Sequence, residues 1–232
     1  MDFTTLTLTD VTRTFGRRRA LHRISLRAEA GDLIAVLGPN GSGKTTLLSI
    51  AATLLRPTTG ELWFGSRDGR EADSALRRRI GLLGHDLYIY PDLSPVENLR
   101  FFGRLYELDH VERRVEEAVA RAGLTERRDD VVSGFSRGMR QRLALERALL
   151  HQPRLALLDE PFTGLDDRAI DALKRRLAGL REAGVIALVA THDLEHVEGI
   201  IDRALVLHGG RLVEVGKGAA PLRERYRAAI AE

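Results

Sequence analysis

A glycine-rich turn between a short apolar run and a helical pattern constrains the fold of this chain more than any other feature. The apolar run covers residues 33–37, the turn follows over residues 38–43, and the helical pattern extends over about residues 45–55. A continuous apolar run of this length is typical of a parallel strand that is buried on both faces of its sheet. We therefore predict an α/β core in which a buried strand leads directly into a helix.

The turn matches the phosphate-binding P-loop pattern in the strand-to-helix context that this pattern requires. Backbone N–H groups of such a turn converge on phosphate oxygens, and the helix N-terminus adds positive potential. Lys44 is expected to carry positive charge to the β- and γ-phosphates, and the Thr45 hydroxyl to ligate Mg²⁺. The alternative is a glycine-rich turn with an incidental lysine. The residues expected to bind ATP here are Gly38, Pro39, Asn40, Gly41, Ser42, Gly43, Lys44, Thr45 and Thr46.

Two carboxylates, Asp159 and Glu160, follow a second apolar run at residues 155–158. The end of a parallel strand would place them beside the nucleotide. We expect Asp159 to join the Mg²⁺ shell through water, and Glu160 to polarise the attacking water or accept its proton. Without the P-loop, the pair would be interpreted as a strand cap before Pro161.

His192 follows a third apolar strand pattern at residues 185–190, so its imidazole is expected at the same edge of the sheet. There it can sense the γ-phosphate. The chain has 7 histidines, and a histidine at a strand end more often has a structural role. The strand pattern alone leaves both interpretations open.

The pattern of predicted elements fits a single domain over residues 1–232. Alternating apolar residues on either side of Gly16 predict an N-terminal antiparallel β-layer. Helical periodicity over about residues 86–153 predicts an inserted helical subdomain, and the parallel-sheet pattern then resumes. Residues 1–85 and 154–232 are thus assigned to the β-layer and the core. A hairpin is expected at residues 204–215, and a short amphipathic helix between Pro221 and Glu232.

The composition favours a folded protein without a membrane span or a disulfide framework. No apolar run approaches the roughly 20 residues that cross a bilayer, no signal peptide is recognisable, and cysteine is absent. The only lysines are Lys44, Lys174 and Lys217, so arginine supplies most of the positive charge. Because the net charge is only +3, we interpret the clusters at residues 17–19 and 77–79 as solvated faces and expect no nucleic-acid partner.

Taken together, these motifs and their order resemble an ATP-binding subunit of the ABC transporter family over nearly the whole chain. The motifs that carry the resemblance are the P-loop, Ser136-Arg137-Gly138-Met139 before a helix, Asp159-Glu160, Gly164-Leu165-Asp166 and His192. The resemblance implies the P-loop NTPase fold of an ABC ATPase and a head-to-tail dimer, formed with a second copy or a related ATPase subunit. It also implies two sandwiched ATP molecules, and it strengthens the catalytic interpretation of His192.

The resemblance also assigns roles to residues outside the P-loop. Phe15 would stack on adenine, although it could be an ordinary packing residue. Ser136 and the backbone of Gly138 would contact the γ-phosphate bound to the other subunit, at the start of a helix. Asp166 would couple the two sites across the dimer.

Two departures from the usual family pattern occur at His85 and Arg137. His85 occupies the place of a glutamine that touches Mg²⁺ and the attacking water, and we expect it to make similar contacts. Arg137 replaces a glycine of the signature segment, where it could hold the nucleotide or face solvent. Both departures resemble one branch of the family, the haem exporter ATPase of cytochrome c maturation.

The predicted function is that of an ATP-hydrolysing motor on the cytoplasmic face of the membrane, in complex with an integral membrane permease. We expect the permease to contact residues 85–90 and the helical subdomain, with Tyr88, Ile89 and Tyr90 either docking it or packing the subdomain. The alternatives are an exporter of another substrate and a soluble ABC ATPase that acts on nucleic acid or ribosomes. Against the latter, such ATPases usually carry long coiled coils or a second cassette, and the segment between Lys44 and Ser136 has room for neither.

Overall fold

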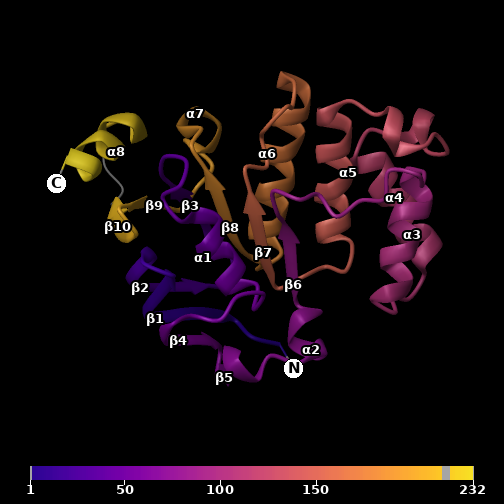
Figure 1. The fold of residues 1–232 in the computed structure, drawn as a ribbon. Helices are drawn as coiled ribbons and strands as arrows, with labels where there is room; N and C mark the ends of the chain where they lie inside the picture. The colour runs from indigo at the N-terminus through magenta and orange to yellow at the C-terminus, as the bar shows by residue number, and fades with distance from the viewer. Residues whose placement is uncertain (1, 216–219, 232) are drawn as a thin grey trace.

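The computed structural model describes residues 2–215 and 220–231; Lys217 and Glu232 lie outside the described residues. A smaller and a larger sheet pack on opposite sides of α1 (Lys44–Ala51), and a helical lobe lies beside the larger sheet (Figure 1). The smaller sheet is antiparallel, in the order β2-β1-β4-β5. Its strands are β1 (Thr5–Phe15), β2 (Arg18–Glu29), β4 (Thr59–Phe64) and β5 (Arg67–Asp68).

The larger sheet has six strands in the order β10-β9-β3-β8-β7-β6. All neighbouring strands pair in parallel except β10, which forms an antiparallel hairpin with β9. The strands are β3 (Leu33–Leu37), β6 (Ile80–Leu83), β7 (Leu155–Asp159), β8 (Ile186–Thr191), β9 (Arg203–His208) and β10 (Arg211–Val215). Because β3, β7 and β8 are parallel neighbours, their carboxyl ends meet at one edge of the sheet.

Strand β3 is buried on both faces, as its continuous apolar run predicts. Ile34 and Val36 pack toward α1 (Lys44–Ala51) and the smaller sheet. Leu33, Ala35 and Leu37 point to the opposite face, into the cluster formed with α5 (Arg137–Leu149) and α6 (Asp167–Glu182). The helix after the turn was expected to extend to about residue 55, but α1 ends at Ala51. It ends early because Thr53 adopts a left-handed conformation with φ 59°.

The helical lobe has its own hydrophobic core, which includes Leu99, Val115, Val119 and Leu143. It is formed by α3 (Pro95–Leu105), α4 (Val111–Arg121) and α5, with 3₁₀ turns at Thr125–Arg127 and Val132–Gly134. A capping box starts α3: the Ser94 hydroxyl accepts a hydrogen bond from the backbone N–H of Glu97, whose carboxylate accepts one from that of Ser94.

Short elements complete the chain: a 3₁₀ turn at Gly69–Glu71, α2 (Ser74–Arg77), α7 (Leu194–Val197) and α8 (Leu222–Ala231). Within the described ranges, no helix has the length and hydropathy that crossing a membrane requires. The α/β core with an antiparallel β-layer and a helical insert confirms the predicted fold class.

Candidate functional site

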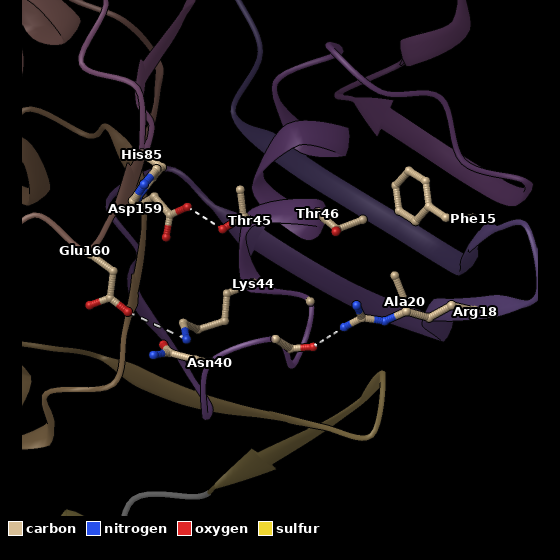
Figure 2. A pocket seen from close by; sticks show the side chains of 12 residues that line it. Phe15, Arg18, Ala20, Asn40, Lys44, Thr45, Thr46, His85, Asp159 and Glu160 are labelled. Atoms are coloured by element: carbon tan, nitrogen blue, oxygen red, sulfur yellow. Dashed lines mark hydrogen bonds and ion pairs between the residues drawn. The ribbon is translucent and has the colours of Figure 1, made fainter.

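A pocket opens where the carboxyl end of β7 faces the turn between β3 and α1 (Figure 2). It brings together residues from the smaller sheet, the P-loop, the loop after β6 and the end of β7. Its lining residues are Phe15, Arg18, Ala20, Asn40, Gly41, Gly43, Lys44, Thr45, Thr46, His85, Asp159 and Glu160. The predicted residues Gly38, Pro39 and Ser42 belong to the same turn but are not in this lining.

The P-loop has the geometry of an anion site. Gly43 precedes α1 with φ 111°, and a side chain there would come within 2.7 Å of the carbonyl oxygen of Ala20, so glycine is required. No side chain caps α1, which leaves its N-terminal N–H groups directed at the pocket. The buried Lys44 is held by hydrogen bonds from its Nζ to the carbonyl oxygens of Gly38, at 2.8 Å, and Pro39, at 3.3 Å.

Thr45 and Asp159 join the P-loop to the larger sheet. The Thr45 hydroxyl donates a 2.6 Å hydrogen bond to Asp159 Oδ2. Burial raises the pKa of the Asp159 carboxyl, and the hydrogen bond from Thr45 opposes that shift. His85, on the loop after β6, lies beside Asp159 (Figure 2).

A hydroxyl and a buried carboxylate are the oxygen donors that Mg²⁺ prefers. In the ranges that the structure covers, no cluster of three or more histidine, cysteine or carboxylate side chains could hold a metal ion alone. The arrangement at Thr45 and Asp159 therefore fits a cation that takes its other ligands from phosphate and water, as Mg²⁺ does.

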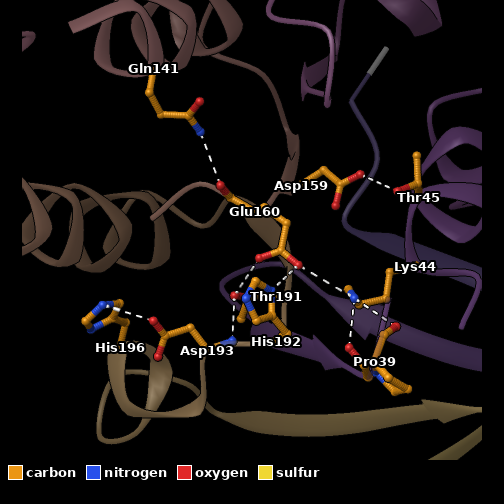
Figure 3. A network of polar contacts seen from close by, with 11 residues as sticks. Pro39, Lys44, Thr45, Gln141, Asp159, Glu160, Thr191, His192, Asp193 and His196 are labelled. Carbon is orange, nitrogen blue, oxygen red and sulfur yellow. Dashed lines mark hydrogen bonds and ion pairs between the residues drawn. The ribbon is translucent and has the colours of Figure 1, made fainter. Parts of the chain in front are cut away.

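Glu160 follows β7 and points into the space between the P-loop and the end of β8 (Figure 3). Its carboxylate accepts a 3.0 Å hydrogen bond from the Thr191 hydroxyl. Its other oxygen lies 2.9 Å from His192 Nδ1 and 3.6 Å from Lys44 Nζ. These three groups hold the carboxylate in place. Because the Glu160 side chain is still 26% exposed, a water molecule can reach it.

Phe15 is the last residue of β1 and is 45% exposed on the wall of the pocket. The guanidinium carbon of Arg13 lies 4.6 Å from the centroid of its ring. This cation–π contact orients the ring, and the exposed part of the aromatic surface faces the pocket. Phe15 therefore does not have the position of an ordinary core residue, and it stays our prediction for adenine stacking.

Ser136 and Gly138 are not part of this pocket. Ser136 is exposed and caps α5, where its hydroxyl accepts a hydrogen bond from the backbone N–H of Met139. A side chain at Gly138 would come within 2.5 Å of the carbonyl oxygen of Gly164, so the first turn of α5 is pressed against that loop. Arg137 packs its aliphatic carbons over the same glycine.

Three residues that contact the pocket or Glu160 were not predicted from the sequence. Arg18 was assigned to a solvated cluster; it is exposed, but its guanidinium donates a 3.0 Å hydrogen bond to the carbonyl oxygen of Gly41. Thr191, whose hydroxyl donates to the Glu160 carboxylate, was not predicted. The side-chain amide of Gln141 donates to the backbone carbonyl oxygens of Glu160 and Pro161. None of these three residues had a local sequence signal, because each contact joins segments that are distant in the sequence.

Comparison with known proteins places these observations in one family. The model described as ABC transporter matches residues 21–163, more than half of the chain. The chain is 35% identical over 218 residues to ABC transporter ATP-binding protein NatA of Bacillus subtilis, covering 91% of this chain and 89% of that protein. It is 36% identical over 214 residues to Nod factor export ATP-binding protein I of Cupriavidus pinatubonensis, covering 91% and 66%.

A solved structure shows the same fold: the dimeric structure of the bacterial ABC transporter cassette MJ0796. It superimposes with a TM-score of 0.84 at 26% identity, covering 92% of this chain and 100% of that chain. A post-hydrolysis state of that cassette, bound to ADP and Pi, is similar with a TM-score of 0.80 at 26% identity over the same shares. The chain belongs to the ABC transporter family, as an ATP-binding subunit that hydrolyses ATP.

Proposed function

We propose that this chain is the motor of an ABC exporter and that Glu160 is the base of its ATPase reaction. One observation carries the catalytic part: the carboxylate of Glu160 lies at the pocket with Lys44 on one side and His192 on the other. A base must be within hydrogen-bonding reach of the water that attacks the γ-phosphate. The open side of this carboxylate faces the place where the P-loop would hold that phosphate.

The other pocket residues would bind and orient the nucleotide. Lys44 and the N–H groups of α1 would hold the β- and γ-phosphates. Thr45 and Asp159 would hold Mg²⁺, which supplies positive charge to the phosphate oxygens when it is bound. His85 is placed to contact the attacking water or the ligands of that ion. We expect Glu160 to take the proton of the water while His192 keeps the carboxylate in position.

The site of one chain is incomplete by itself, and we propose that a second copy or a related ATPase subunit completes it head to tail. Ser136 is exposed at the N-terminus of α5 and does not line its own pocket. That helix end would point its N–H groups at the γ-phosphate of the partner's nucleotide. Asp166 caps α6 just beyond the loop against which Gly138 packs, where it would lie at the dimer boundary.

We further propose that residues 86–153 move as one lobe and carry the contact with a membrane permease, at the cytoplasmic face. Tyr88 and Tyr90 are 55% and 46% exposed, and Phe101 packs edge-on against Tyr90 at 5.1 Å between ring centroids. Exposed aromatic side chains of this kind are common anchors in interfaces. Ile89, in contrast, packs against the hydrophobic clusters of the core and the lobe, so we do not include it in the contact.

Our proposals for the direction of transport and for the cargo are based on resemblance to other family members. Export is supported by the likeness to a Nod factor export protein. Haem is our candidate cargo because His85 and Arg137 match the haem exporter branch, although no relative reported above is named for haem. The test is to purify the chain with its membrane partner and to compare ATPase stimulation by haem and by unrelated hydrophobic compounds. Equal stimulation by all of them would remove haem as the specific cargo.

The test of the motor assignment is Glu160→Gln, with Glu182→Gln at the exposed end of α6 as a matched control. We expect Glu160→Gln to bind ATP with unchanged affinity, to lose most of its turnover and to accumulate as an ATP-bound dimer in size-exclusion chromatography. Turnover at the wild-type rate would show that Glu160 is not the base.

The membrane contact is tested with the double variant Tyr88→Ala and Tyr90→Ala. We expect this variant to keep basal ATP hydrolysis and to lose its stimulation by the permease. Arg168→Ala, at an exposed position of α6 outside the lobe, serves as a control. Normal stimulation of the tyrosine variant would mean that these side chains only pack the lobe.

A further inference from the structure

Gln141 connects the helix that begins at Ser136 to the backbone of the residue that we propose as the base. It lies in the second turn of α5, and its side chain is 7% exposed. Its Nε2 is 3.2 Å from the carbonyl oxygen of Glu160 and 3.4 Å from that of Pro161 (Figure 3). The amide therefore bridges two successive carbonyl groups at the end of β7.

The backbone at this point adopts a conformation that needs support. Glu160 has φ 48°, in the left-handed region that residues other than glycine rarely adopt. Its own N–H donates to the carbonyl oxygen of Ala190 at 2.8 Å, and its carbonyl also accepts from the backbone N–H of Thr163 at 3.2 Å. The direction of the Glu160 side chain depends on these backbone angles. A change in them would move the carboxylate away from His192 and from Lys44.

A second contact joins the same two segments. The first turn of α5 is packed against the loop after Glu160, so closely that Gly138 admits no side chain beside Gly164. The N-terminus of α5 and residues 160–164 are thus connected twice, by packing at Gly138 and by the amide of Gln141.

We propose that Gln141 is a positioning residue that sets the direction of the Glu160 carboxylate and couples it to the N-terminus of α5. This inference rests on the proposed roles of Glu160 and of the head-to-tail dimer. In that dimer, α5 contacts the nucleotide of the partner while Glu160 serves the nucleotide of its own chain. Binding of ATP in one site would fix α5 and, through Gln141, would orient the base of the other site.

Kinetic measurements can distinguish the proposed coupling role of Gln141 from a purely structural role. A residue that only anchors α5 would affect folding stability and nucleotide binding, whereas a residue that orients a base affects kcat. A residue that acts through the Glu160 carboxylate should also have little effect once that carboxylate is replaced. Kinetics in two backgrounds therefore separate the two roles.

The experiment uses the full-length chain with Gln141→Glu, which keeps the size but replaces the donor, and Gln141→Met, which removes the donor without adding a charge. The same substitutions at the exposed Gln152 are the matched controls. We expect both Gln141 variants to lower kcat by about tenfold, with KM changed by less than about twofold and with reduced cooperativity toward ATP. In the Glu160→Gln background, single-turnover hydrolysis should show no further loss.

The inference is overturned if the Gln141 variants raise KM at unchanged kcat, or if they lower the rate by the same factor in both backgrounds. If Gln141→Glu unfolds, as a buried charge can cause, Gln141→Met decides alone. A Glu160→Gln enzyme with wild-type turnover would instead refute the proposed base itself, and with it this role of Gln141. The single variants and the double variant thus report on the two proposals separately.

Discussion

His192 Nδ1 lies 2.9 Å from Oε1 of Glu160, although the two residues are 32 positions apart in the sequence. The contact follows from the sheet order, because β7 and β8 are parallel neighbours and end at the same edge. His192 is 60% exposed, so it orients the carboxylate from the solvent side while the Thr191 hydroxyl holds it from the other. Two consecutive residues, Thr191 at the end of β8 and His192 just after it, thus hold the carboxylate of the proposed base in place.

We predict that His192→Ala lowers kcat for ATP hydrolysis by roughly 10²-fold and leaves the dissociation constant for ATP nearly unchanged. Without the imidazole, the Glu160 carboxylate can turn toward Lys44 and away from the water. His192→Gln retains a hydrogen-bonding group and should recover part of the rate. Steady-state kinetics combined with nucleotide titration measure both quantities. His208→Ala, at the exposed end of β9, is the control, and a His192→Ala enzyme with only KM altered would contradict the prediction.

Arg18 supplies the second prediction, because its guanidinium reaches the P-loop at Gly41 and lines the same pocket as Lys44. We expect Arg18→Ala to raise the KM for ATP by roughly three- to tenfold at nearly unchanged kcat, since one charge that attracts the triphosphate is lost. The effect should shrink at high salt because the group is exposed.

The control for this experiment is Arg17→Ala, the neighbouring arginine of the same cluster, which is exposed and does not line the pocket. It should leave KM and kcat unchanged. Equal effects of the two substitutions would mean that Arg18 acts only through the overall charge of the surface.

The parts of the site that could be predicted from the sequence are those encoded by neighbouring residues. The P-loop and the pair Asp159 and Glu160 each combine an apolar strand with polar residues directly after it, so both the element and the position of the side chains follow from a local pattern. The α/β class follows from the same runs. The roles assigned to these residues nevertheless stay predictions until variants are measured.

What could not be predicted depends on contacts between distant segments. Gln141 is separated from Glu160 by 19 positions, and its donation to that carbonyl requires the packing of α5 on the loop after β7. Arg18 looked like one of several surface arginines until β2 was paired with β1 and placed beside Gly41. Ile89 was grouped with its exposed aromatic neighbours, but tertiary packing turns it inward. The helix after the P-loop ended early because of one left-handed residue, Thr53.

His151 is a buried group outside the catalytic pocket whose protonation opposes folding. Its ring stacks on Tyr106 with 4.1 Å between centroids, and its Nε2 lies 3.1 Å from the carbonyl oxygen of Ile80. Its Nδ1 is buried and, among the described residues, has no hydrogen-bond partner. Burial lowers the pKa of His151 from 6.5 to about 4; the hydrogen bond to Ile80 opposes this shift, and the nearby positive charges of Arg147 and Arg79 contribute to it.

The third prediction concerns the pH dependence of stability. Because the folded pKa of His151 is lower than the unfolded value, the unfolded chain binds the extra proton between pH 6.5 and about 4, and stability falls as the pH falls through that window. Relative to His151→Phe, which keeps the stacking on Tyr106 and cannot titrate, the wild-type chain should lose about 2 kcal/mol between pH 7 and pH 5. Urea unfolding at both pH values measures the difference. His208→Phe, at an exposed position, should show the wild-type pH dependence, and parallel curves for the wild type and His151→Phe would show that His151 is already protonated in the folded chain or is not buried there.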